Sequence, residues 1–166
     1  MSLTQDIAAT WRGPGRVVAR LMTLEARESR ALYFLMMASI LLFVARAPTE
    51  ARMAALDPEG PPLPARLFFS ALGILAFVPM LAYGFAALSH GVARLLGAGQ
   101  GGFSGARLAL FWALLAISPL TLLMGLVAGL VGQGMELSLL LYAWLGVFAW
   151  FWIGGLRATN AVGQAA

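Results

Sequence analysis

Four long runs without a charged residue constrain the fold of this chain more than any other feature. They cover residues 31–45, 67–89, 108–135 and 137–156. An α-helix rises about 1.5 Å per residue, so about 20 apolar residues cross the roughly 30 Å hydrocarbon core of a bilayer. The 166 residues are 61% hydrophobic and 11% charged, which is more apolar surface than a soluble fold of this size can bury. The sequence therefore predicts an all-α fold, an integral membrane bundle of four transmembrane helices.

The transmembrane domain is predicted at 31–157, followed by a short cytoplasmic tail at 158–166. The four spans are expected at about 31–46, 67–89, 108–131 and 137–156. The first run holds only fifteen residues between Arg30 and Arg46, and it spans the bilayer if both arginines snorkel outward. The alternative for this run is a re-entrant or interfacial segment.

The distribution of arginine predicts the orientation of these spans. Eight arginines fall on one side: Arg12, Arg16, Arg20, Arg27, Arg30, Arg94, Arg107 and Arg157. The other side carries three, Arg46, Arg52 and Arg66, mixed with acidic residues. Loops rich in arginine stay in the cytoplasm, so the N- and C-termini are both predicted to be cytoplasmic. All eleven basic residues are arginine, which favours a GC-rich bacterial genome and a bacterial inner (cytoplasmic) membrane.

The first 30 residues are predicted to form amphipathic helices rather than a loose tail. Ser2 and Gln5 fit a capping box, and Pro14 suits the first turn of a second helix. Apolar and arginine side chains occupy different faces, a pattern typical of a helix in the headgroup region. The alternative, which is compatible with it, is a cytoplasmic helix packed on the chain's own bundle. The candidates for interfacial docking are Trp11, Val17, Val18, Leu21 and Met22.

Proline and glycine give the loops and the packing candidates. Five prolines in 47–66 predict an extended outer loop, and Ser104 is expected to cap the third span. Residues 97–102 match G-x-G-x-x-G without the strand that a dinucleotide site requires, so they predict a flexible connector. Pro79 and Pro119 are candidates for helix kinks, either as hinges or as tolerated prolines.

Small residues at helical spacing in the third run predict close helix packing. The candidates are Gly125, Gly129 and Gly132. They serve packing within the bundle or, alternatively, a homodimer.

Composition also limits the chemistry of the chain. There is no cysteine, and the one histidine, His90, is expected to be a hydrogen-bonded interfacial residue. No ionisable residue lies deep within the four runs, which argues against a pump, an ion channel or an intramembrane hydrolase. The sequence thus predicts no catalytic residues, no metal site, no cofactor and no nucleic-acid partner.

Several strings resemble a known family. They are Trp11–Arg16, Glu25–Arg30, Ala86–Gly97 (AALSHGVARLLG) and Ala106–Ala113 (ARLALFWA). Across its whole length the chain resembles the bacterial members of the Yip1 family of small polytopic membrane proteins, in their short alphaproteobacterial form. The resemblance implies a multi-pass helical protein; the family is usually drawn with five spans, against four predicted here. It transfers no functional residue.

The function expected from these observations is non-enzymatic. The leading hypothesis is an accessory, structural or assembly subunit that contacts membrane lipids and associates with a larger inner-membrane complex. The alternative is a facilitator or lipid-handling protein for a small neutral or apolar substrate.

Overall fold

The computed structural model describes residues 2–24, 27–95 and 102–164. These residues form seven helices and no strand, so the all-α prediction is confirmed for them. The helices are α1 (Leu3–Thr10), α2 (Pro14–Met22), α3 (Arg27–Leu56), α4 (Leu63–Leu95), α5 (Gly102–Ala116), α6 (Ser118–Leu130) and α7 (Met135–Gln164).

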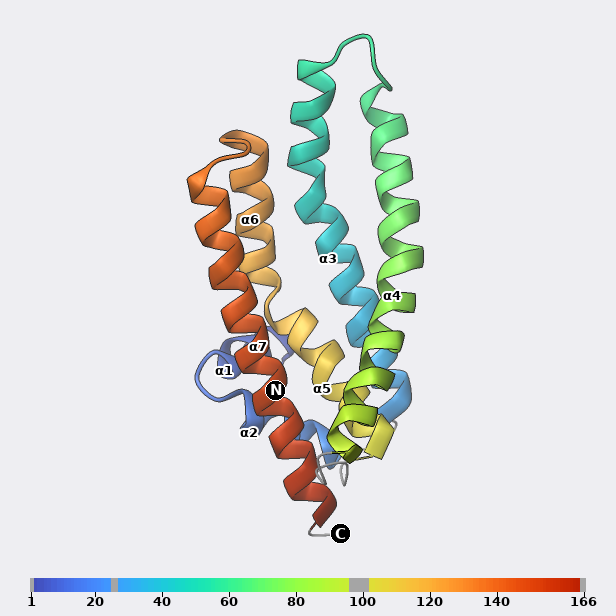
Figure 1. Cartoon of the computed structure of the whole chain (residues 1–166), viewed down its shortest axis with the longest axis vertical. Helices are drawn as coiled ribbons and strands as arrows, with labels where there is room; N and C mark the ends of the chain where they lie inside the picture. Colours follow the sequence, from blue (N-terminus) through green and yellow to red (C-terminus); the bar gives the residue numbers. More distant parts are fainter. Residues whose placement is uncertain (1, 25–26, 96–101, 165–166) are drawn as a thin grey trace.

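Three of the helices are long and apolar enough to cross a membrane: Glu28–Leu56, Leu63–Val92 and Met135–Gln164. α5 and α6 pass the same test only together, with a bend of 46° between them. The long helices give the molecule its elongated shape, with the α3–α4 hairpin reaching beyond the turn between α6 and α7 (Figure 1).

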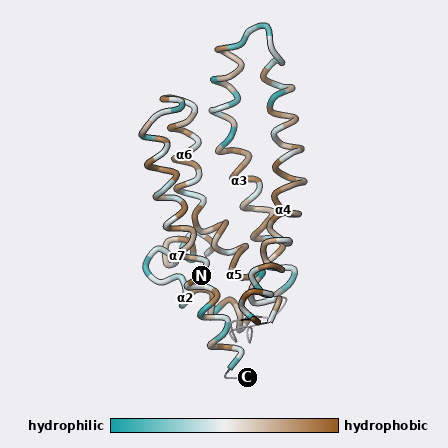
Figure 2. Tube along the Cα trace, in the orientation of Figure 1, coloured by the Kyte–Doolittle hydropathy of each residue, from teal (hydrophilic) through white to brown (hydrophobic). Residues whose placement is uncertain are grey.

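The core of the molecule is built around α5. Its side chains from Leu108 to Ala113 are all essentially buried, with Phe111 and Trp112 the largest. α5 contacts α3, α4 and α7, and both short N-terminal helices also reach it. Hydrophobic residues continue along the outer faces of the long helices, while the tip of the α3–α4 hairpin is hydrophilic (Figure 2). The hydrophobic core therefore lies at the end of the molecule that holds α1, α2 and α5.

The N-terminal helices form as their sequence predicts. Ser2 accepts a hydrogen bond from the backbone of Gln5, and the Gln5 side chain accepts one from the Ser2 backbone, which completes the capping box. Pro14 begins α2, where its missing N–H costs nothing. α2 then lies against α7, where Gly154 leaves room for the Pro14 ring.

The prediction of an extended loop at 47–66 was wrong, because the helix that holds the predicted span at 31–46 continues well into this segment. α3 continues unbroken through Pro48 to Leu56, and only residues 57–62 separate it from α4. Pro48 is seated directly on Gly129 of α6, and an ion pair between Arg46 and Glu50 bridges its position. These contacts offset the backbone hydrogen bond that the proline removes.

Other boundaries also differ from the sequence prediction. The span expected at 108–131 is split at Ile117, between α5 and α6. Ser104 lies inside the first turn of α5 rather than at its cap, because the helix begins at Gly102. α4 and α7 extend past the spans predicted at 67–89 and 137–156, so most of the expected tail is helical. The connector predicted at 97–102 lies almost entirely outside the described residues.

Candidate functional site

An open groove of about 520 Å³ lies between α3, α4 and α6. Its walls are mainly apolar, and three polar side chains reach it. The lining residues are Leu42, Ala45, Arg46, Thr49, Ser70, Gly73, Ile74, Phe77, Val78, Gly125 and Ala128. A volume of this size falls in the range of small-molecule sites, about 300–1,000 Å³.

The groove has a polar end and an apolar end. α3 and α4 run in opposite directions, so Thr49 on α3 and Ser70 on α4 both lie toward the hairpin tip. Leu42 and Val78 both lie at the other end. From Ser70 to Val78 the groove runs about 12 Å along α4. The polarity of the lining therefore changes along the groove, from hydrogen-bonding side chains at one end to hydrocarbon side chains at the other. This is the distribution that an amphiphilic ligand would match.

A hydrogen-bonded ion pair marks the polar end. Arg46 Nε lies 3.1 Å from Glu50 Oε1, and Ser70 Oγ lies 2.8 Å from the same oxygen. Glu50 is buried, whereas the Arg46 side chain is 58% exposed. Both residues lie beyond the uncharged run at 31–45, in the part of α3 that continues to Leu56. Glu50 thus holds the Nε edge of the Arg46 guanidinium. The rest of the guanidinium is exposed and can donate to another group.

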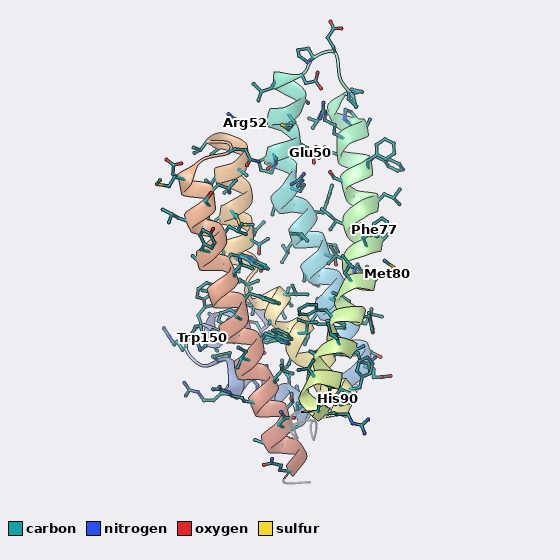
Figure 3. The ribbon with its side chains drawn as sticks, viewed as in Figure 1. Glu50, Arg52, Phe77, Met80, His90 and Trp150 are labelled. Carbon is teal, nitrogen blue, oxygen red and sulfur yellow. The ribbon has the colours of Figure 1, made fainter. Side chains whose placement is uncertain are left out.

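Arg52 ties the upper part of α3 to the end of α6. Its Nη1 lies 3.0 Å from the carbonyl oxygen of Leu130 and 3.4 Å from that of Gly129. A guanidinium there satisfies free carbonyls and complements the negative end of the helix dipole. Figure 3 shows Arg52 and Glu50 on the upper part of α3, near the level at which α6 turns into α7.

The predicted packing glycines have two different uses. A Cβ on Gly125 would lie 1.9 Å from the carbonyl oxygen of Ala45, and one on Gly129 would lie 2.4 Å from the Pro48 Cβ. Both glycines therefore let α6 approach α3 within the same chain. Gly132 lies beyond the end of α6 with φ +96, and its N–H donates to the Val127 carbonyl, so it terminates the helix.

The two candidate kink prolines also differ. Pro119 lies in the first turn of α6, where the chain bends by 46°. Pro79 lies inside α4, which is one continuous helix from Leu63 to Leu95.

The candidate docking face of α2 is covered by the protein itself. Val17, Val18, Leu21 and Met22 are each no more than 5% exposed. They pack into the core beside α5 and α7, so packing on the chain's own bundle describes their place. Trp11 remains partly exposed and meets Phe151 edge-on, with ring centroids 5.2 Å apart.

His90 lies near the end of α4 (Figure 3). Its ring meets that of Phe103, with centroids 6.0 Å apart, and within the described part of the chain it makes no hydrogen bond. The hydrogen-bonded role expected for it is therefore not seen there. The described residues also contain no group of three or more histidine, cysteine or acidic side chains that could hold a metal.

Sequence reasoning missed the groove and its polar end. Arg46 and Glu50 stand four apart, a spacing that signals an ion pair only once both are known to be helical. Ser70 gave no signal, because a serine near the end of an apolar run is ordinary.

No protein-family model matches the chain, and neither a curated protein nor a solved structure matches it. The resemblance to the Yip1 family stays a prediction from the sequence.

Proposed function

We propose that this chain is a non-enzymatic, four-span membrane protein that binds a phospholipid in the groove between α3, α4 and α6. The single observation that carries the proposal is the graded lining of the groove. Arg46, Thr49 and Ser70 would hold the headgroup, and Leu42 and Val78 would contact the hydrocarbon chain. Lipid handling, the alternative expected from sequence, becomes the leading function because the surfaces expected to dock a partner on α2 and α6 are used inside the chain.

Four spans are supported by contacts at both ends of α3. Arg107 near the start of α5 pairs with Glu28, and Arg52 bonds the end of α6. Between Glu28 and Arg52, α3 rises about 36 Å, more than the hydrocarbon thickness of a bilayer. These contacts at both ends of α3 support α5 and α6 as one bent span beside α3 rather than as a re-entrant loop. With the arginine distribution, this predicts both termini on the cytoplasmic side of a bacterial inner membrane.

The test is to fill the groove without disturbing the fold. A Cβ added at Gly73 would meet nothing within 4 Å, and the residue lines the groove. Gly84, also on α4, has the same open space but lies outside the groove. We expect native mass spectrometry of the detergent-purified protein to find one fewer bound phospholipid in Gly73→Leu than in the wild type. Gly84→Leu should bind the wild-type number. Equal retention by both variants would contradict lipid binding in the groove.

An accessory role remains a second candidate because of the outward face of α4. Large apolar side chains on this face are more than half exposed, including Phe68, Phe69, Leu72 and Met80. Aromatic residues are enriched at protein interfaces, so this face fits another membrane protein as well as lipid. A stoichiometric protein that copurifies with the wild type but not with Phe69→Ala/Leu72→Ala would favour the accessory role.

A further inference from the structure

The turn between α1 and α2 carries a basic hollow of about 260 Å³. Arg12, Arg16 and Arg20 line it, and Arg20 is paired with Asp6. Arg12 and Arg16 form no ion pair with any residue that the structure describes, so these two side chains give the hollow two positive charges. A Cβ on Gly13 would lie 2.7 Å from Arg16 Nε, so this glycine lets the Arg16 guanidinium fold over the turn. Arg12 and Arg16 are both exposed and offer their donors to an anion.

An apolar hollow of about 580 Å³ adjoins the basic one. It is lined by Thr4, Ile7, Ala8, Trp11, Arg12 and Pro119. Arg12 lines both hollows, so a cationic and an apolar surface meet at this side chain. A soluble anion would use only the first surface, whereas an acylated phosphate would use both.

The corner is held rigidly by the rest of the protein. Val18 and Leu21 on the opposite face of α2 are buried in the core. Thr10 at the end of α1 accepts a hydrogen bond from Trp112 of α5. Since the apolar face of α2 is covered, this helix can meet a membrane only through its arginine side. The backbone that carries the arginines is therefore held by the bundle, and its position does not depend on membrane insertion of the helix.

From this geometry we infer that the α1–α2 corner binds one anionic phospholipid. The phosphate lies at Arg12 and Arg16, and an acyl chain lies against Trp11 and Pro119. This site is separate from the groove between α3, α4 and α6, and it stands whether or not that groove holds a lipid.

The test titrates the detergent-purified full chain with phosphatidylglycerol or phosphatidylcholine and counts bound lipid by native mass spectrometry. The wild type is expected to bind phosphatidylglycerol more tightly. Arg12→Gln/Arg16→Gln should weaken that binding by about twenty-five-fold, since each arginine near anionic headgroups contributes about fivefold. Arg12→Lys/Arg16→Lys keeps both positive charges and should retain most of the affinity for phosphatidylglycerol.

The matched control is Arg94→Gln/Arg157→Gln, which removes two exposed arginines outside both hollows. It should bind phosphatidylglycerol like the wild type. If the two glutamine pairs weaken binding equally, or if neither does, the site is overturned. If glycerol 3-phosphate, which lacks acyl chains, displaces the lipid at concentrations comparable to phosphatidylglycerol itself, the acyl part of the inference is overturned.

Discussion

Trp112 in the middle of α5 donates a hydrogen bond from its Nε1 to the Oγ1 of Thr10 in α1, 3.0 Å away. Both side chains are essentially buried, and the Thr10 hydroxyl in turn donates to the Asp6 carbonyl oxygen at 2.8 Å. This short chain of bonds fastens the N-terminal helix to the most buried helix of the molecule. It explains how a segment of eight residues is ordered as part of the bundle.

Removing the hydroxyl should loosen this attachment. Thr10→Val has nearly the same shape but leaves the indole N–H buried without a partner, which costs about 2 kcal/mol of unfolding free energy. Unfolding in detergent, followed by circular dichroism, should show this loss. Thr10→Ser keeps the hydroxyl and serves as the control. An unchanged stability of Thr10→Val would mean that the hydrogen bond does not hold α1.

The approach of α6 to α3 should be sensitive to a single methyl group at Gly125. In Gly125→Ala the Cβ would meet the Ala45 carbonyl oxygen, so the helices must separate. We expect a loss of about 2 kcal/mol, typical of overpacking. Gly146→Ala on α7 is the control, because a Cβ there meets nothing within 4 Å and should raise stability by about 0.5–1 kcal/mol. Equal stabilities of the two variants would show that α6 can shift without cost.

The membrane topology can be tested with single cysteines, because the chain has none of its own. Thiols at Glu59→Cys and Gln133→Cys should react with an impermeant maleimide in spheroplasts. Thr23→Cys and Gln164→Cys should react only after lysis. Gln133 is decisive, since it follows α6: protection of this position would mean that α5 and α6 form a re-entrant loop.

Local features of the fold could be predicted from the sequence. The capping box at Ser2 and the start of α2 at Pro14 depend on neighbouring residues only, and the structure has both. The apolar runs also predicted the central parts of α4 and α7, because the length of an apolar helix can be estimated from one contiguous segment.

Features that depend on distant contacts could not be predicted. α3 continues through Pro48, whose ring packs against Gly129 of α6. Gly129 lies 81 residues later in the chain, so no local sequence pattern could indicate this contact. The choice between lipid and protein for the apolar face of α2 required the position of α7. The groove exists only because α3, α4 and α6 are placed around it, so its residues are scattered from Leu42 to Ala128.

The most direct test of lipid binding in the groove is photocrosslinking with a phospholipid that carries a diazirine on its acyl chain, followed by mapping of the modified peptides. If the groove holds the chain, crosslinks should concentrate in residues 42–49 and 70–78, and should disappear from both segments in Gly73→Leu but not in Gly84→Leu. Crosslinks spread evenly over the exposed faces of α4 and α7, and unchanged by Gly73→Leu, would contradict the proposed function.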